Sequence, residues 1–84
     1  KNQILIGFSA ETEKILVNSK KKIENKNLDF IVANDISKNG SGFGSDSNFT
    51  YLINSKNEIK KLGLKSKKYI AEKIADEVEK IRQD

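Results

Sequence analysis

The chain has 84 residues, a net charge of +4, and neither cysteine nor histidine. This length allows one small domain with a modest core. The missing cysteine excludes disulfides and thiolate chemistry, and the missing histidine removes the commonest general base and metal ligand. No apolar run is long enough to span a membrane and no signal-peptide pattern is present, so we expect a cytoplasmic protein.

The positive charge leaves several classes of partner open. A basic balance is typical of proteins that bind nucleic acid, a membrane surface or an anionic small ligand. A lysine-rich surface is also an ordinary means of staying soluble. Composition alone therefore does not decide between a binding surface and a solvated one.

Two apolar runs flank an amphipathic segment in the first part of the chain. Residues 3–8 and 30–33 lack the alternation of half-exposed strands and are typical of buried ones. Cap-type side chains at 9–12 precede the segment between them. One face of that segment, read as a helix, carries Ile15, Leu16, Ser19 and Ile23. The pattern predicts a βαβ unit with a right-handed crossover.

The second half predicts a hairpin and a final helix. Residues 49–53 read as a strand, and 59–62 as a short returning strand at an edge, because Lys60 and Lys61 discourage further pairing. Ser66 is a suitable N-cap for the helix. An apolar stripe at helical spacing follows it, formed by Ile70, Ile74, Val78 and Ile81. We therefore predict an α/β fold of the three-layer type, with a Rossmann-like βαβ unit followed by a β-hairpin and a C-terminal helix.

Polar residues follow the second apolar run at the place where ligands bind in open α/β sheets, the carboxyl ends of the strands. Asn34 offers two donors and an acceptor, and Asp35 a carboxylate. Both are also common turn residues. The loop after them contains Gly40, Gly42 and Gly44 but no phosphate-loop pattern, and Asp35 with Asp46 would be a weak Mg²⁺ site.

Three further residues are candidates for ligand contact, each with an ordinary alternative. Phe8, which is expected to end the first strand, could stack on a planar base or simply close the core. Lys22 and Lys26 are four apart, so on a helix they share a face, where like charges repel unless a polyanion binds them. The alternative is that they form a solvated lysine face.

Several uncommon segments together resemble one family. Residues 7–12 are similar to its GFAAET segment, and 26–35 to its KNLD.IVAND segment. Residues 42–48 are similar to its GFGSDxN loop, and 66–74 to its SKxxxAxxI helix. The order and spacing agree over nearly the whole chain. The chain therefore resembles bacterial phosphopantothenoylcysteine synthetase, the synthetase half of the bifunctional DNA/pantothenate metabolism flavoprotein.

The resemblance implies an activity and a set of contacts. The family joins cysteine to 4′-phosphopantothenate in coenzyme A biosynthesis, using CTP and Mg²⁺ through an acyl-cytidylate. By position, Phe8, Lys22 and Lys26 inherit a nucleotide contact, and Asn34 lies near the nucleotide or substrate. FMN is implied only for the decarboxylase half of the bifunctional protein.

The resemblance also implies missing parts. The family's synthetase domain is more than twice as long, so residues 1–84 are expected to be its C-terminal part, without catalytic residues or a metal site of their own. The first strand would be central in the whole domain, and a homo-oligomer is implied. We expect no nucleic acid or membrane partner. The alternatives are a basic non-enzymatic α/β binding module and a structural domain without a site.

Overall fold

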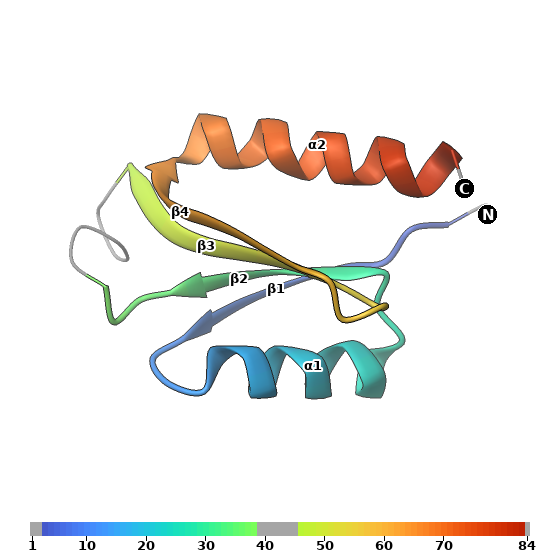
Figure 1. Cartoon of the computed structure of the whole chain (residues 1–84), viewed down its shortest axis with the longest axis horizontal. Coiled ribbons are helices and arrows are strands. Elements are labelled where there is room, and N and C mark those ends of the chain that lie inside the picture. Colours follow the sequence, from blue (N-terminus) through green and yellow to red (C-terminus); the bar gives the residue numbers. More distant parts are fainter. Residues whose placement is uncertain (1–2, 39–45, 84) are drawn as a thin grey trace.

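The computed structural model describes residues 3–38 and 46–83. In chain order the elements are β1 (Ile6–Glu11), α1 (Ile15–Lys26), β2 (Phe30–Asp35), β3 (Ser47–Asn54), β4 (Ile59–Ser66) and α2 (Lys67–Gln83). The strands form one sheet, with α1 on one face and α2 on the other (Figure 1). The three-layer α/β prediction is confirmed. The glycine-rich loop, residues 40–44, lies outside the described residues.

The sheet has the order β1-β2-β3-β4. β1 and β2 are parallel and joined through α1, while β2–β3 and β3–β4 are antiparallel. This confirms the predicted βαβ unit and the hairpin after it. β1 and β4 are the two outer strands of the described sheet, so the prediction that the returning strand lies at an edge is also confirmed.

Two apolar clusters share β2. Ile31 and Ala33 pack with Ile23 and Ile53 beneath α1, and Phe30 and Val32 pack with other apolar residues beneath α2. These four apolar residues of β2 are each at most 2% exposed. A strand buried on both faces reads as a continuous apolar run, which is why its sequence lacks alternation.

β1 differs from its prediction in position and burial. It begins at Ile6 and continues to Glu11, because it pairs with β2 as far as Asp35. Phe8 is therefore in mid-strand, and its side chain is 67% exposed. The predicted capping segment at 9–12 was wrong: α1 begins after Lys14, which has a φ of 50° and makes no side-chain cap hydrogen bond.

β4 is longer than predicted because a bulge lets it continue to Ser66. The register shifts opposite Thr50 and Tyr51, and Gly63 there has a φ of 78°, a conformation that favours glycine. At the end of β4 the Ser66 Oγ accepts a hydrogen bond from the Tyr69 backbone N–H at 3.1 Å, which confirms the predicted N-cap of α2.

Neither described helix is long and apolar enough to cross a bilayer.

We predict that the free edge of β1 makes the chain self-associate. The outer side of β1 has no partner strand among the described residues, and exposed Phe8 and Leu5 add apolar surface there. Sedimentation equilibrium should therefore show an average mass that rises with concentration. Ala10→Lys puts a charge on this edge and should shift the distribution toward monomer, whereas Ala71→Lys, an exposed position on α2, is the matched control. A monomer at every concentration would contradict the prediction.

Candidate functional site

The candidate site lies where β1 and β2 end side by side. The two strands are parallel and in register through Glu11 and Asp35, so their carboxyl ends meet at one edge of the sheet (Figure 1). In open α/β sheets, ligands bind in the crevice outside these ends. Successive side chains on a strand point to opposite faces, so the site has an α1 side and an α2 side.

Phe8 lies on the α2 side of β1. It has the same parity as Ile6, which packs into the cluster beneath α2, and it is paired with Val32 of β2. With its side chain 67% exposed, the ring does not close the core, and that alternative reading is wrong. An exposed aromatic ring on an outer strand presents a flat face on which a base can stack.

Asn34 shares this side of the sheet. It follows Val32 by two residues on β2 and is half-buried. Its Oδ1 accepts a hydrogen bond of 2.8 Å from the Thr50 hydroxyl of β3. Phe8 and Asn34 are thus diagonal neighbours on adjacent strands, and the structure brings these two predicted residues together.

Lys22 lies on the other face of the sheet, on α1. Its Nζ is 2.5 Å from the Glu11 Oε2, and the Asn18 Nδ2 donates to the other Glu11 oxygen at 3.2 Å. The hydrogen bond from Lys22 lowers the pKa of Glu11, and the one from Asn18 acts in the same direction. Lys22 therefore reaches the carboxyl end of β1 with its charge already paired.

Lys26 is separated from the other three. It is the last residue of α1, which runs back from the strand ends toward the amino end of β2, and it is exposed (Figure 1). The structure thus places Phe8 and Asn34 together, Lys22 at the same end on the opposite face, and Lys26 at the far end of α1. A ligand that touches both Phe8 and Lys22 has to reach both faces of the sheet.

The carboxylates of the edge belong to no cluster of three or more metal ligands among the described residues. One oxygen of Asp35, Oδ1, accepts hydrogen bonds from the backbone N–H and the hydroxyl of Ser37, at 3.0 and 2.5 Å. This is the local turn contact that the sequence left open beside a Mg²⁺ role. Residues 3–38 and 46–83 contain no group of three or more Asp or Glu side chains placed to hold a metal ion.

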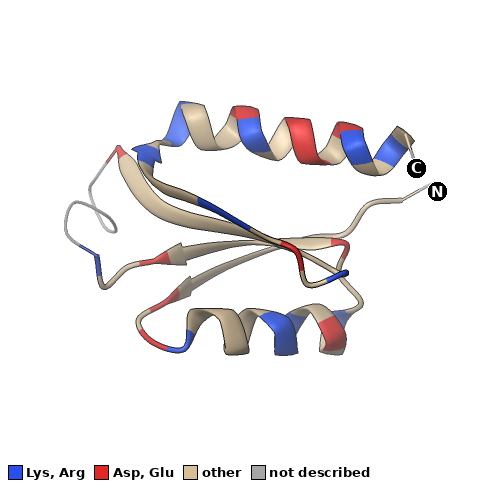
Figure 2. Ribbon diagram, viewed as in Figure 1, with Lys and Arg blue, Asp and Glu red and all other residues tan. Residues whose placement is uncertain are grey.

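Charge is not gathered on one surface. Basic and acidic residues alternate along α2, and both β1 and β2 carry an acidic residue where they end (Figure 2). Nucleic-acid-binding domains concentrate lysine and arginine on one face. The distribution therefore does not favour the nucleic-acid alternative.

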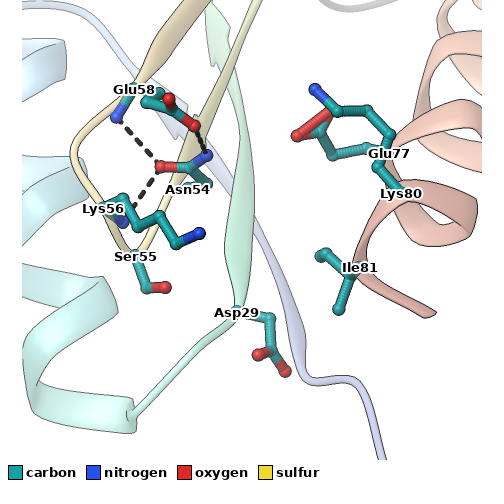
Figure 3. A pocket seen from close by; sticks show the side chains of 8 residues that line it. All are labelled: Asp29, Asn54, Ser55, Lys56, Glu58, Glu77, Lys80 and Ile81. Atoms are coloured by element: carbon teal, nitrogen blue, oxygen red, sulfur yellow. Dashed lines mark hydrogen bonds between the residues drawn. The ribbon is translucent and has the colours of Figure 1, made fainter. Parts of the chain in front are cut away.

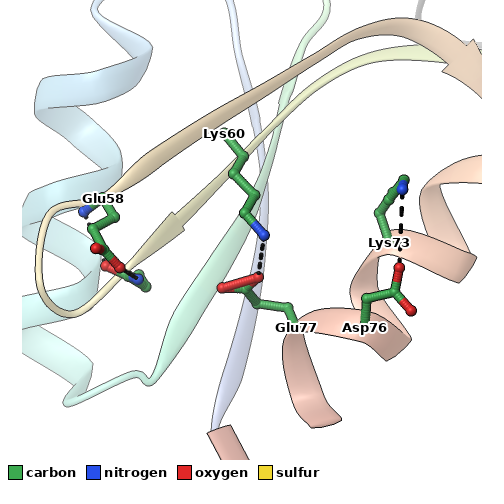
Figure 4. A network of polar contacts seen from close by, with 6 residues as sticks. Glu58, Lys60, Lys73, Asp76 and Glu77 are labelled. Atoms are coloured by element: carbon green, nitrogen blue, oxygen red, sulfur yellow. Dashed lines mark hydrogen bonds and ion pairs between the residues drawn. The ribbon is translucent and has the colours of Figure 1, made fainter. Parts of the chain in front are cut away.

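A pocket of about 290 Å³ lies at the opposite end of the sheet, between the β3–β4 turn and the C-terminal half of α2 (Figure 3). The polar side chains that line it largely form hydrogen bonds or ion pairs with other residues of the chain. Asn54 Nδ2 donates to Glu58 at 2.6 Å, and Lys60 Nζ is 3.0 Å from buried Glu77 (Figure 4). This ion pair raises the pKa of Lys60. Since the pocket adjoins the amino end of β2, it is not the strand-end site.

Two residues of the edge were missed from the sequence: Glu11, which pairs with Lys22, and Thr50, which bonds Asn34. Both depend on contacts between segments far apart in the chain. The alternation of the strand at 49–53 places the Thr50 side chain on the other face of the strand from Phe49 and Tyr51. It does not show which strand lies beside this one. Only the register of β2 with β3 pairs Thr50 with Asn34.

The fold and its edge define the class of protein: an open α/β domain with an exposed aromatic ring on β1 and a hydrogen-bonded amide near the end of β2. The chain belongs to the DNA/pantothenate metabolism flavoprotein C-terminal domain family, whose model matches residues 1–81.

Similar proteins agree with this membership. The coenzyme A biosynthesis bifunctional protein CoaBC of Bacillus subtilis is 42% identical over 78 residues, covering 93% of this chain and 19% of that protein. A cysteine/cysteine sulfinic acid decarboxylase from an unknown prokaryotic organism is 42% identical over 81 residues, covering 96% and 22%. The crystal structure of the C-terminal domain of CoaBC superposes with a TM-score of 0.78 at 36% identity, covering all of this chain and 40% of that one. The chain thus spans about a fifth of these curated relatives.

We predict that Glu11→Gln reduces the pH dependence of stability. Because the pKa of Glu11 is lowered in the fold, its charged form adds to the free energy of unfolding above the ordinary value of 4.5. That contribution is lost as the pH falls through the lower, folded pKa. Lys22 is 41% exposed, so the difference should be below about 1 kcal/mol.

Urea unfolding over a pH series measures this difference. The wild type should be more stable than Glu11→Gln at neutral pH, and the two curves should converge in acid. Glu24→Gln, which removes an exposed carboxylate from α1, is the matched control for the charge change. A difference that stays constant at every pH would contradict the prediction.

Proposed function

We propose that this chain forms part of the nucleotide site of a ligase that joins cysteine to 4′-phosphopantothenate in coenzyme A biosynthesis. The proposal is supported by the family membership and by the names of the relatives. The observation that carries it is that exposed Phe8 and half-buried Asn34 are diagonal neighbours on the same face of β1 and β2.

The proposed reaction has two steps. The carboxylate of 4′-phosphopantothenate attacks the α-phosphorus of CTP, and the bond to pyrophosphate breaks to leave an acyl-cytidylate. The amine of cysteine then attacks the acyl carbon, CMP leaves with the electron pair of the broken bond, and the nitrogen loses a proton to solvent to give the amide. Both steps move negative charge among phosphate oxygens, so preorganised donors and cations lower the barrier.

The residues of this chain would divide the nucleotide between them. The ring of Phe8 offers a stacking surface for the base, and the amide hydrogens of Asn34 can donate to ribose or phosphate oxygens. Lys22 and Lys26 would face the phosphates. The separation of Lys26 from the strand ends means that it can act only on a part of the ligand that extends along α1.

Mg²⁺ and FMN are not assigned to side chains of this chain. Mg²⁺ binds nucleotide phosphates with one or two carboxylates and keeps several waters, and the described residues provide no cluster of ligands for it. It would therefore enter with CTP. FMN belongs to the decarboxylase half implied by the family resemblance. Cysteine and 4′-phosphopantothenate would be the other ligands of the ligase. The ligase would act as a homo-oligomer.

We predict that CTP binds at the strand ends. In an NMR titration of the ¹⁵N-labelled chain, CTP should shift the backbone signals of Phe8 and Asn34 and, with its phosphates, those of Lys22 and Lys26. Phe8→Ala should weaken binding by an amount equivalent to about 1–3 kcal/mol, the usual worth of a stacked base. Val17→Ala is the control: it truncates an exposed apolar side chain on α1, away from Phe8 on β1, and should bind CTP as the wild type does. Shifts confined to other regions would refute the site.

We further predict that the chain alone does not turn over substrate. In the proposed reaction both attacking groups belong to the substrates, and this chain would supply only part of the nucleotide site. A coupled assay for pyrophosphate with CTP, 4′-phosphopantothenate, cysteine and Mg²⁺ should give the rate of the buffer control. Turnover that depends on the concentration of the chain would be the contrary result.

A further inference from the structure

We infer that Thr50 is a positioning residue for the nucleotide site: its hydroxyl fixes the side-chain amide of Asn34 so that the two amide hydrogens face the ligand. The inference rests on the proposed function, because it assigns a role at the same site. It concerns a residue on β3 that does not itself need to touch the nucleotide.

The contact is direct and partly buried. Thr50 and Asn34 are a cross-strand pair in the β2–β3 register, and the Thr50 Oγ1 donates to the Asn34 Oδ1 at 2.8 Å. Thr50 is 0% exposed, whereas Asn34 is half-buried. A buried hydroxyl needs a hydrogen-bond partner, and this bond satisfies it.

The bond has a consequence for the other end of the amide. With Oδ1 held by Thr50, the Nδ2 group points away from β3. Among residues 3–38 and 46–83 its two hydrogens have no acceptor, so they are available to an oxygen of the ligand. Without the hydroxyl, rotation about the last side-chain bond would exchange donor and acceptor at little cost.

The neighbours of this pair in the sheet register have small side chains. Across the sheet at the level of this pair stand Ala10, Asn34, Thr50 and Gly63. Nothing lies within 4 Å of where a Cβ on Gly63 would be. Two residues back, the corresponding row holds the larger side chains of Phe8, Val32, Leu52 and Lys60. The side chains paired at the level of Asn34 are therefore smaller than those paired at the level of Phe8.

A structural role is the alternative to positioning. Polar cross-strand pairs stabilise sheets by a few tenths of a kcal/mol to about 1 kcal/mol each, whatever binds nearby. The two roles differ in one measurable respect. A structural pair changes the free energy of unfolding only, whereas a positioning residue changes nucleotide affinity, and does so only while Asn34 is present.

A double-mutant cycle with CTP as the probe tests this. Thr50→Val keeps the shape and removes the hydroxyl, and Thr50→Ser is the control that keeps it. Thr50→Ala replaces Thr50→Val if the valine variant does not fold. In NMR titrations, Thr50→Val should raise the CTP dissociation constant by about three- to tenfold, the worth of one hydrogen bond, and Thr50→Ser by less than about twofold. In the Asn34→Ala background, Thr50→Val should have no further effect.

Each other outcome is decisive. If Asn34→Ala weakens CTP binding and Thr50→Val does not, or if their effects add, the positioning role is wrong and the proposed function stands. If Asn34→Ala leaves the affinity unchanged while Phe8→Ala lowers it, the inference fails because Asn34 has no contact to orient, and nucleotide binding again stands. If the wild-type chain gives no response to CTP, the proposed function and the inference both fail.

Discussion

The burial of β2 on both faces is the constraint on which the rest of this structure depends. Phe30 and Val32 fill the cluster beneath α2, and Ile31 and Ala33 fill the one beneath α1. The side chains of Phe30, Ile31 and Val32 each add roughly 1.5–3 kcal/mol to the free energy of unfolding when fully buried. A one-residue slip would exchange the two faces, so the register of β2 with its neighbours is strongly specified.

This register decides what the end of β2 can do. Because the apolar run fixes which residues face α1 and α2, the next two side chains are separated to opposite faces. Asn34 turns to the α2 side and meets Thr50, whereas Asp35 turns to the α1 side and is bonded by Ser37. The polar pair that looked like one ligand set in the sequence therefore acts as two separate groups, and only Asn34 shares a face with Phe8.

The sequence was sufficient for the parts of the fold that local patterns determine. The double-sided burial of β2 follows from a run of apolar residues, and the N-cap of α2 from Ser66. The length of β1 could not be predicted, because its last residues are strand only through pairing with β2, and the bulge at Gly63 sets the length of β4. The pairing of Thr50 with Asn34 depends on the register of distant strands. Likewise, the partner of Lys22 lies eleven residues earlier, beyond any helical periodicity.

The pairing of Lys22 changes how the proposed site would recognise a nucleotide. Two lysines on one helix suggest a strong attraction for phosphates, but Glu11 neutralises one of them at the strand ends and Lys26 lies at the far end of α1. A polyanion that displaced Glu11 would break an existing ion pair, so the loss of that pair would partly offset the new contact. Recognition by this chain would then depend more on the stacking surface of Phe8 and the oriented amide of Asn34 than on charge. Most of the compensation for the phosphates would have to come from groups other than these two lysines.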